Sequence, residues 1–223
     1  MVKAVIFDLD DTLISEKEYI KSGYKHIAAI IEERLKINKK QVFDDLIGLF
    51  KENSQNVFNG LYEKYHIEYS NEMILDLVKE YRGHNPNIQF YNDVLPCLDG
   101  LKRLGIKTGI ITDGYAITQH QKLRAVEANK YFDVIIVTDE LGRDYWKPHP
   151  KAFELIREKL KVNFDEMIYI GDNPEKDFYI RTIYPIKVIR IVRKDIVHSS
   201  KFYHKSIEED YRIESLEELN KYL

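Results

Sequence analysis

The sequence predicts an α/β protein: a Rossmann-like, three-layer core with a parallel sheet, plus an inserted α-helical domain. Three observations predict this class. Short apolar runs of strand length recur along the chain, and from residue 95 they alternate with segments of helical periodicity. Between residues 16 and 90 helical periodicity continues without a strand-like run. The hydrophobic share of 44% and the charged share of 32% are typical of a soluble folded chain.

The predicted core comprises residues 1–15 and 91–223, and its strands are apolar runs rich in β-branched residues. Runs of this kind, joined by helices, predict parallel strands that are buried on both faces of the sheet. The runs are Ala4–Phe7, Gly109–Ile111, Val134–Val137, Met167–Ile170 and Val188–Val192.

The predicted inserted domain, residues 16–90, contains four amphipathic helices. Ser70 is a candidate N-cap for the last of them. The stretch from Gly83 to Asn92 contains Pro86 and several asparagines, and it predicts a return linker. The helix faces are formed by Ile20, Tyr24, Ile27, Ile31 and Leu35; by Val42, Leu46, Leu49 and Phe50; by Val57, Leu61 and Tyr65; and by Ile74, Leu77, Val78 and Tyr81.

The rest of the core sequence predicts connecting helices and loops. Apolar spacing predicts one helix around Leu98–Leu104 that Gly105 closes, and another around Phe153–Leu160. Asp139–Trp146 is predicted to be a loop. After Val192 a polar stretch follows, and Ser215–Leu223 is predicted to be a short final helix.

Bulk composition argues against several classes of function. The net charge is −3, so the chain lacks the basic excess that a nucleic-acid partner favours. Its single cysteine, Cys97, rules out a disulfide within the chain and fits a reducing compartment. The apolar runs are too short for a bilayer span or a signal sequence. We therefore expect a cytoplasmic protein with no membrane partner.

Polar residues with catalytic potential follow the predicted strands. Parallel α/β sheets bind ligands beyond the carboxyl ends of their strands, so these residues are expected at one edge. They are Asp8, Asp10, Asp11 and Thr12 after the first strand, Thr112 and Asp113 after the second, Lys147 in the loop after the third, and Gly171, Asp172, Asn173 and Asp177 around the end of the fourth.

This set of residue types suits phosphoryl transfer. Clustered carboxylates need a cation to stay ionised, and ligands that are all oxygen favour a hard ion such as Mg²⁺. A lysine together with a metal neutralises the charge of the transferred phosphoryl group. An aspartate can itself act as the nucleophile.

The four segments resemble the four motifs of the haloacid dehalogenase (HAD) superfamily, in the same order. Asp-x-Asp-x-Thr is matched by Asp8, Asp10 and Thr12, and the second motif by Thr112 in "GIITDG". Lysine before proline is matched by Lys147, and Gly-Asp with a later Asp is matched in "YIGDNPEKD". The resemblance extends to about residue 192. It implies the strand order 5-4-1-2-3 and identifies the inserted domain as a helical, C1-type cap.

The resemblance also implies roles for individual residues. Asp8 would be the nucleophile, and Asp10 would be the general acid and then the general base. Asp8, the backbone carbonyl of Asp10, and Asp172 would hold Mg²⁺. Thr112 and Lys147 would bind phosphate together with Asp8. In supporting roles, Asp177 would orient Lys147 or the water shell of the metal, Thr12 would hold the turn, and Asn173 would either contact that shell through water or cap the next helix.

The function predicted from these features is a Mg²⁺-dependent phosphatase that hydrolyses a small phosphorylated metabolite through an aspartyl-phosphate. Having both Asp8 and Asp10 points to phosphate esters rather than carbon–halogen bonds. Nucleotides, sugar phosphates and phosphoglycolate are all compatible substrates. Two alternatives stay open: a phosphotransferase such as a sugar-phosphate mutase, and a non-enzymatic binding protein. One departure from the superfamily is the bulky stretch "FYIRTIYPIKVIRIV", which lacks the expected small residues.

Overall fold

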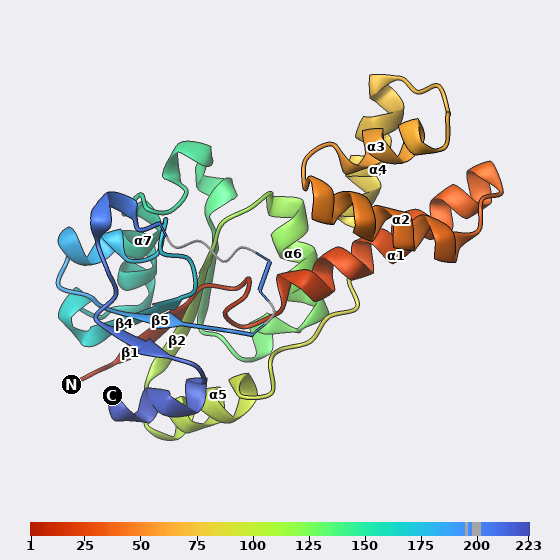
Figure 1. Ribbon diagram of the computed structural model, residues 1–223. Helices are drawn as coiled ribbons and strands as arrows, with labels where there is room; N and C mark the ends of the chain where they lie inside the picture. Colours follow the sequence, from red (N-terminus) through yellow and green to blue (C-terminus); the bar gives the residue numbers. More distant parts are fainter. Residues whose placement is uncertain (195, 198–201) are drawn as a thin grey trace. The chain divides into compact units, whose positions relative to one another are not determined.

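A computed structural model describes residues 1–194, 196–197 and 202–223 (Figure 1). The chain divides into two compact units. One unit consists of Met1–Lys17 and Ile88–Leu223, and the other of Glu18–Asn87. Among the helices in these described ranges, none combines the length and the apolar composition that crossing a bilayer requires.

The first unit contains a parallel sheet that has, within the described residues, six strands in the order β3-β2-β1-β4-β5-β6. Apart from β6, this confirms the predicted order. The strands are β1 (Ala4–Phe7), β2 (Lys107–Thr112), β3 (Val134–Val137), β4 (Met167–Gly171), β5 (Lys187–Ile191) and β6 (Tyr211–Ile213).

Strand β6 was not predicted from the sequence. It has three residues, only Ile213 is buried, and it pairs with β5 at the edge of the sheet. A strand this short and this exposed carries no alternating pattern to detect. The polar stretch that precedes it lies partly outside the described residues.

Helices cover both faces of the sheet, so the strands are buried on each side. Ala4 and Ile6 of β1 join the apolar cluster under α7 (Lys151–Leu160). Val5 and Phe7 join the opposite cluster, with α5 (Val94–Arg103) and α6 (Ala116–Ala125). Figure 1 shows α5 and α7 on opposite sides of the sheet. The three layers of the predicted core are therefore confirmed.

The predicted helices between residues 16 and 90 are present. They are α1 (Glu16–Leu35), α2 (Lys39–Glu52), α3 (Val57–Lys64) and α4 (Asn71–Gly83). Ser70 Oγ accepts a hydrogen bond from Met73 N, which confirms Ser70 as the cap of α4. In the core of the second unit, the ring of Tyr24 packs against Phe50, Phe58 and Tyr81.

The connections contain short 3-10 turns that the sequence did not predict. The expected loop 139–146 forms two such turns, and the predicted final helix is a 3-10 helix whose capping box pairs Ser215 with Glu218. Gly105 closes α5 with a φ of +69°, as predicted. The 3-10 segments are Ala128–Lys130, Thr138–Leu141, Arg143–Tyr145, Phe164–Glu166, Tyr179–Thr182, His204–Ser206 and Leu216–Lys221.

The structure explains why the stretch after the fourth motif has bulky residues in place of small ones. It forms only one 3-10 turn, Tyr179–Thr182, before β5 begins. Phe178 and Ile180 are buried in the cluster on the α7 side of the sheet. Large side chains here fill the layer that a helix of small residues would otherwise occupy.

A buried ion pair joins the end of the sheet to the start of α5. The Arg193 guanidinium donates to both carboxylate oxygens of Asp93, at 2.6 and 3.0 Å, and to the carbonyl of Thr12. Asp93 also accepts from Leu216 N at 2.8 Å. Burial raises the pKa of the Asp93 carboxyl, but the bonds from Arg193 and Leu216 outweigh burial and hold this pKa below its usual value.

Replacing Asp93 with asparagine should destabilise the core by about 3 kcal/mol at neutral pH, because Arg193 would keep a buried charge without a counter-charge. The pKa of Asp93 is lowered in the folded state, so its stabilisation is present at neutral pH and is lost as pH falls through that pKa. Urea unfolding of wild type and Asp93→Asn, at neutral pH and at an acidic pH where Asp93 is protonated, measures the difference in unfolding free energy. Asp99→Asn, an exposed site on the same helix, is the matched control. Equal stability of the wild type and Asp93→Asn at neutral pH would contradict this role.

Candidate active site

The predicted catalytic residues lie at the carboxyl ends of adjacent central strands. Strand β1 lies between β2 and β4, with Phe7 in register with Ile110 on one side and Ile170 on the other. Asp8 follows directly and donates its backbone N–H to the carbonyl of Ile170 at 2.8 Å. Thr112 ends β2, and Asp172 follows β4. The parallel register therefore brings three of the four motifs together.

The ammonium of Lys147 is the centre of this site. Lys147 Nζ lies 2.7 Å from Asp8 Oδ1, 2.8 Å from Asp177 Oδ1 and 2.8 Å from Tyr169 Oη. Tyr169 Oη in turn donates to Asp177 Oδ1 at 2.9 Å. The side chains of Lys147 and Asp177 are fully buried. Because a lysine ammonium has three N–H donors, all of them are engaged.

Mutual charge keeps buried Lys147 and Asp8 ionised. Burial alone would lower the pKa of Lys147, but the charges of Asp177 and Asp8 raise it above its usual value. Burial alone would raise the pKa of Asp8, but the charges of Lys147 and Lys176 bring it below its usual value. Asp8 is therefore a carboxylate at neutral pH. Burial and the charge of Asp177 raise the pKa of Tyr169, which keeps its hydroxyl proton for the bond to Asp177.

The carboxylates around Asp172 form a candidate metal site. Asp8, Asp172 and Asp177 offer carboxylate oxygens that all lie within 4.8 Å of one another. Burial, and then the charges of Asp177 and Asp8, raise the pKa of Asp172 well above its usual value. When all three carboxylates are ionised, they and the Lys147 ammonium carry two net negative charges, which one divalent cation would balance. The all-oxygen donor set fits a hard ion such as Mg²⁺.

Gly171 gives Asp177 its place in this cluster. A Cβ at Gly171 would collide with the Asp177 carboxylate. Asp177 is further fixed by the backbone N–H of Asn173, which donates to its Oδ2 at 2.9 Å. The glycine of the fourth motif is thus explained by a close approach. Asp177 contacts Lys147 directly.

The carboxylate of Asp10 points to helix α6. Lys122 Nζ lies 2.7 Å from Asp10 Oδ1, and Gln119 Nε2 lies 2.9 Å from Asp10 Oδ2. Gln119 Nε2 also lies 2.5 Å from Thr112 Oγ1 and 2.8 Å from the carbonyl of Asp113. The side chain of Asp10 is thus engaged by α6, and the predicted metal contact of this residue is through its backbone carbonyl.

Three supporting residues lie in turns around the cluster. Thr12 Oγ1 is buried without a hydrogen bond to the described residues, while the carbonyl of Thr12 accepts from Arg193. Asn173 Oδ1 accepts from Glu175 N at 2.9 Å, within a turn and not at the start of a helix. Asp11 adopts a φ of 50° and accepts from Glu16 N, so it lies in the turn that leads into α1.

Asp113, whose direction the sequence did not predict, belongs to the framework of the site. Its Oδ1 accepts from Thr138 Oγ1 at 2.7 Å and from Lys147 N at 3.2 Å. Lys176 Nζ lies 3.7 Å from Asp113 Oδ2, with about a quarter (27%) of the Lys176 side chain exposed. Asp113 therefore positions the lysine loop and balances a second ammonium.

Sequence reasoning missed four residues of this site: Gln119, Lys122, Tyr169 and Lys176. Three of them left a signal. Gln119 and Lys122 are spaced i, i+3 on the helix that follows Thr112, so they lie on one helix face. Tyr169 places a hydroxyl inside a doubly buried strand, where it needs a partner. Lys176 carries no such signal, because a lysine in a polar loop is usually solvated.

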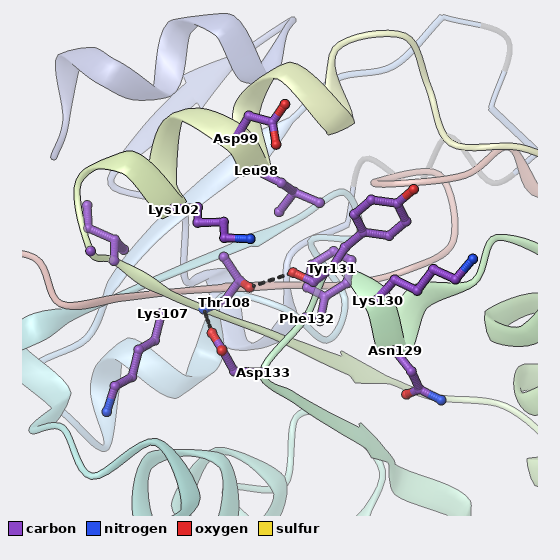
Figure 2. Close-up of a pocket in the computed structure, with 12 residues that line it drawn as sticks. Leu98, Asp99, Lys102, Lys107, Thr108, Asn129, Lys130, Tyr131, Phe132 and Asp133 are labelled. Atoms are coloured by element: carbon purple, nitrogen blue, oxygen red, sulfur yellow. Dashed lines mark hydrogen bonds between the residues drawn. The ribbon is translucent and has the colours of Figure 1, made fainter.

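A separate hollow of about 520 Å³ lies at the opposite edge of the sheet, at the amino ends of β2 and β3 (Figure 2). There Asp133 Oδ2 accepts from Thr108 N at 2.7 Å, and Thr108 Oγ1 donates to the carbonyl of Tyr131 at 3.2 Å. These contacts join the two strands. The polar groups of the hollow thus serve the sheet, and the motif residues lie elsewhere.

A parallel α/β core with carboxylates gathered around one buried ammonium defines a hydrolase of the phosphatase type. Residues 5–182 match the haloacid dehalogenase-like hydrolase family, and the chain belongs to this family. The predicted superfamily and the predicted class of enzyme are therefore confirmed.

Known relatives agree with this class. A glyceraldehyde 3-phosphate phosphatase of Methanocaldococcus jannaschii is 29% identical over 230 residues, covering 98% of this chain and 96% of that protein. A protein of the same name from Methanopyrus kandleri is 30% identical over 186 residues, covering 79% of this chain and 78% of that protein. Among solved structures, a HAD phosphatase from Thermococcus onnurineus has a TM-score of 0.63 at 26% identity, covering 99% of this chain and 97% of that one.

Asp172→Asn should stabilise the metal-free protein at neutral pH. The pKa of Asp172 is raised in the folded state, so the folded chain holds a proton that the unfolded chain has released, and stability falls as pH rises through that pKa. An amide removes this cost, and we expect the melting temperature in a chelator to rise by at least about 2 °C.

Thermal unfolding with and without Mg²⁺ tests this expectation. Added Mg²⁺ should stabilise the wild type and leave Asp172→Asn unchanged. Asp165→Asn, which changes an exposed acid before β4, is the control and should behave as the wild type. A lower melting temperature for Asp172→Asn in chelator would show that the carboxylate is not under electrostatic strain.

Proposed function

We propose that the protein is a Mg²⁺-dependent phosphatase that hydrolyses a small phosphorylated metabolite through an aspartyl-phosphate on Asp8. One observation carries this proposal. Asp8 is a buried carboxylate whose pKa is lowered, with Lys147 Nζ at 2.7 Å. It lies at the carboxyl ends of the parallel strands, where sheets of this kind bind ligands. A buried, ionised aspartate at that position is suited to attack phosphorus.

In the first step, a carboxylate oxygen of Asp8 attacks the phosphorus and the bond from phosphorus to the ester oxygen breaks. Asp10, in its protonated form, gives its proton to the departing oxygen. Thr112 and Lys147 bind the phosphoryl oxygens, and Lys147 neutralises part of their charge. The product of this step is the Asp8 phosphate and a free alcohol.

In the second step, the Asp10 carboxylate takes a proton from water, and the water oxygen attacks the phosphorus. The bond between phosphorus and Asp8 breaks, which restores the carboxylate and releases inorganic phosphate. Bound Mg²⁺ supplies charge neutralisation for the phosphoryl group. Asp8, Asp172 and the backbone carbonyl of Asp10 are the ligands that we propose for it, and Asp177 positions Lys147.

The helical unit is proposed to act as a cap that selects the substrate and excludes bulk water. Its place in the chain supports this role, because the chain leaves the core at Lys17, shortly after Asp8 and Asp10. We place the protein in the cytoplasm. The Cys97 thiol, whose pKa burial raises to about 12, is unreactive, and the chain contains no second cysteine.

The proposed substrate is a three-carbon sugar phosphate, with glyceraldehyde 3-phosphate as the first candidate. The names of the two archaeal relatives support this choice, and one of them matches almost the whole chain. A small phosphorylated metabolite rather than a nucleic acid also agrees with the net charge of −3.

Asp8→Asn should reduce phosphate release by at least about a thousandfold, because the amide cannot form the acyl phosphate. The measurement is phosphate release from glyceraldehyde 3-phosphate and a panel of sugar phosphates and nucleotides, with Mg²⁺ and with chelator. Wild type should lose activity in chelator and regain it with Mg²⁺. Asp165→Asn serves as the control variant. Full activity of Asp8→Asn would refute the aspartyl-phosphate route.

The same assay separates hydrolysis from the alternatives. A phosphatase releases inorganic phosphate in water alone, whereas a phosphotransferase waits for a sugar hydroxyl. We expect the Asp8 phosphate to turn over without a sugar acceptor. Accumulation of a long-lived phosphoenzyme until a sugar is added would favour the mutase, and no turnover of any ester would favour a binding protein.

A further inference from the structure

We infer that Gln119 and Lys122 of helix α6 are positioning residues that set the Asp10 carboxylate for proton transfer to the leaving group. This inference rests on the proposed function, in which Asp10 is the general acid and base. Neither residue belongs to the four motifs, and both contact the carboxylate of Asp10, which is a motif residue.

The contacts fix Asp10 at both of its oxygens. Lys122 Nζ lies 2.7 Å from Oδ1, and Gln119 Nε2 lies 2.9 Å from Oδ2. Rotation about the last bond of an aspartate is otherwise broad, so a carboxylate held at one point could still turn. Two donors from one rigid helix fix that rotation. Each oxygen keeps another lone pair for the transferred proton.

Packing alone does not explain why these two side chains are polar. Only 3% of the Lys122 side chain is exposed, and Gln119 is equally buried. Leu123 and Val126 of the same segment join the apolar cluster of the sheet face. A lysine is almost never fully buried unless its charge is paired, and burying that charge is costly. A methionine would fill the position of Lys122 more cheaply if packing were its purpose.

Gln119 also joins Asp10 to the phosphate-binding side of the site. Its Nε2 lies within hydrogen-bond distance of Thr112 Oγ1 and of the Asp113 carbonyl. One amide thus bridges the carboxylate of Asp10, in the turn after β1, and the hydroxyl of Thr112 at the end of β2. A phosphoryl group bound at Thr112 would place its ester oxygen in a fixed relation to Asp10.

The test uses leaving groups that differ in their need for a proton. An alkyl phosphate releases an alkoxide that must be protonated, whereas a p-nitrophenyl ester releases a stable anion. The parameter kcat/KM reports only the steps up to release of the alcohol, so hydrolysis of the Asp8 phosphate does not enter. We expect Lys122→Met to lower kcat/KM for the alkyl ester about a hundredfold, and for the aryl ester less than about threefold.

Matched variants complete the experiment. Gln119→Leu removes the second donor and should also lower kcat/KM more for the alkyl ester than for the aryl ester. This variant keeps the test open if Lys122→Met fails to fold. Lys122→Arg should restore most of the alkyl-ester activity. Arg124→Met removes an equal charge from an exposed position of the same helix and should match the wild type on both esters. Circular dichroism and urea midpoints verify folding.

Equal losses on the two esters, or no loss on either, would overturn the inference, because a merely structural role does not distinguish leaving groups. Asp10→Asn provides the reference. If Asp10→Asn shows leaving-group selectivity and the α6 variants do not, only the positioning role fails. If Asp10→Asn itself shows none, the proposed acid role of Asp10 fails, and the inference fails with it.

Discussion

The fold depends at its centre on one constraint: the buried ammonium of Lys147 must be surrounded by partners. Its three donors reach Asp8 after β1, Tyr169 in β4 and Asp177 in the turns after β4. Removing such a charge from water is costly, and only close counter-charges and hydrogen bonds repay that cost. The Lys147 ammonium therefore fixes the end of β1, β4 and the loop after β3 relative to one another.

The same cluster creates a need that the described residues do not meet. Lys147 is shared by Asp8 and Asp177, and Lys176 pairs with Asp113, but Asp172 makes no ion pair with a described residue. Its raised pKa expresses that imbalance. The lysines of the site thus pair with Asp8, Asp177 and Asp113, and Asp172 is the carboxylate whose charge a divalent ion would balance.

The sequence predicted those parts of the structure that depend on local pattern. Apolar runs located five strands, helical spacing located the long helices, and strand ends located Asp8, Thr112 and Asp172 because parallel strands share one active edge. It did not predict β6, which is too short to show alternation. Nor did it predict Gln119, Lys122 or Tyr169, whose importance comes from contacts with residues far away in sequence. In the sequence Tyr169 is one more large residue in an apolar run, and its role follows only from the contact with Lys147.

Asp8 and Asp10 thus differ in which lysine supplies their counter-charge, and this difference fits the separate roles that we propose for them. Asp8 is balanced by buried Lys147 and stays ionised, which suits the nucleophilic role that we propose for it. Asp10 is held by a different buried lysine, Lys122 of α6, and about a fifth (18%) of the Asp10 side chain is still exposed. A residue that exchanges protons with a leaving group and with water needs access to solvent, whereas a nucleophile benefits from the exclusion of solvent. The two aspartates stand two positions apart in sequence, yet different elements fix them, which lets one strand end carry both tasks.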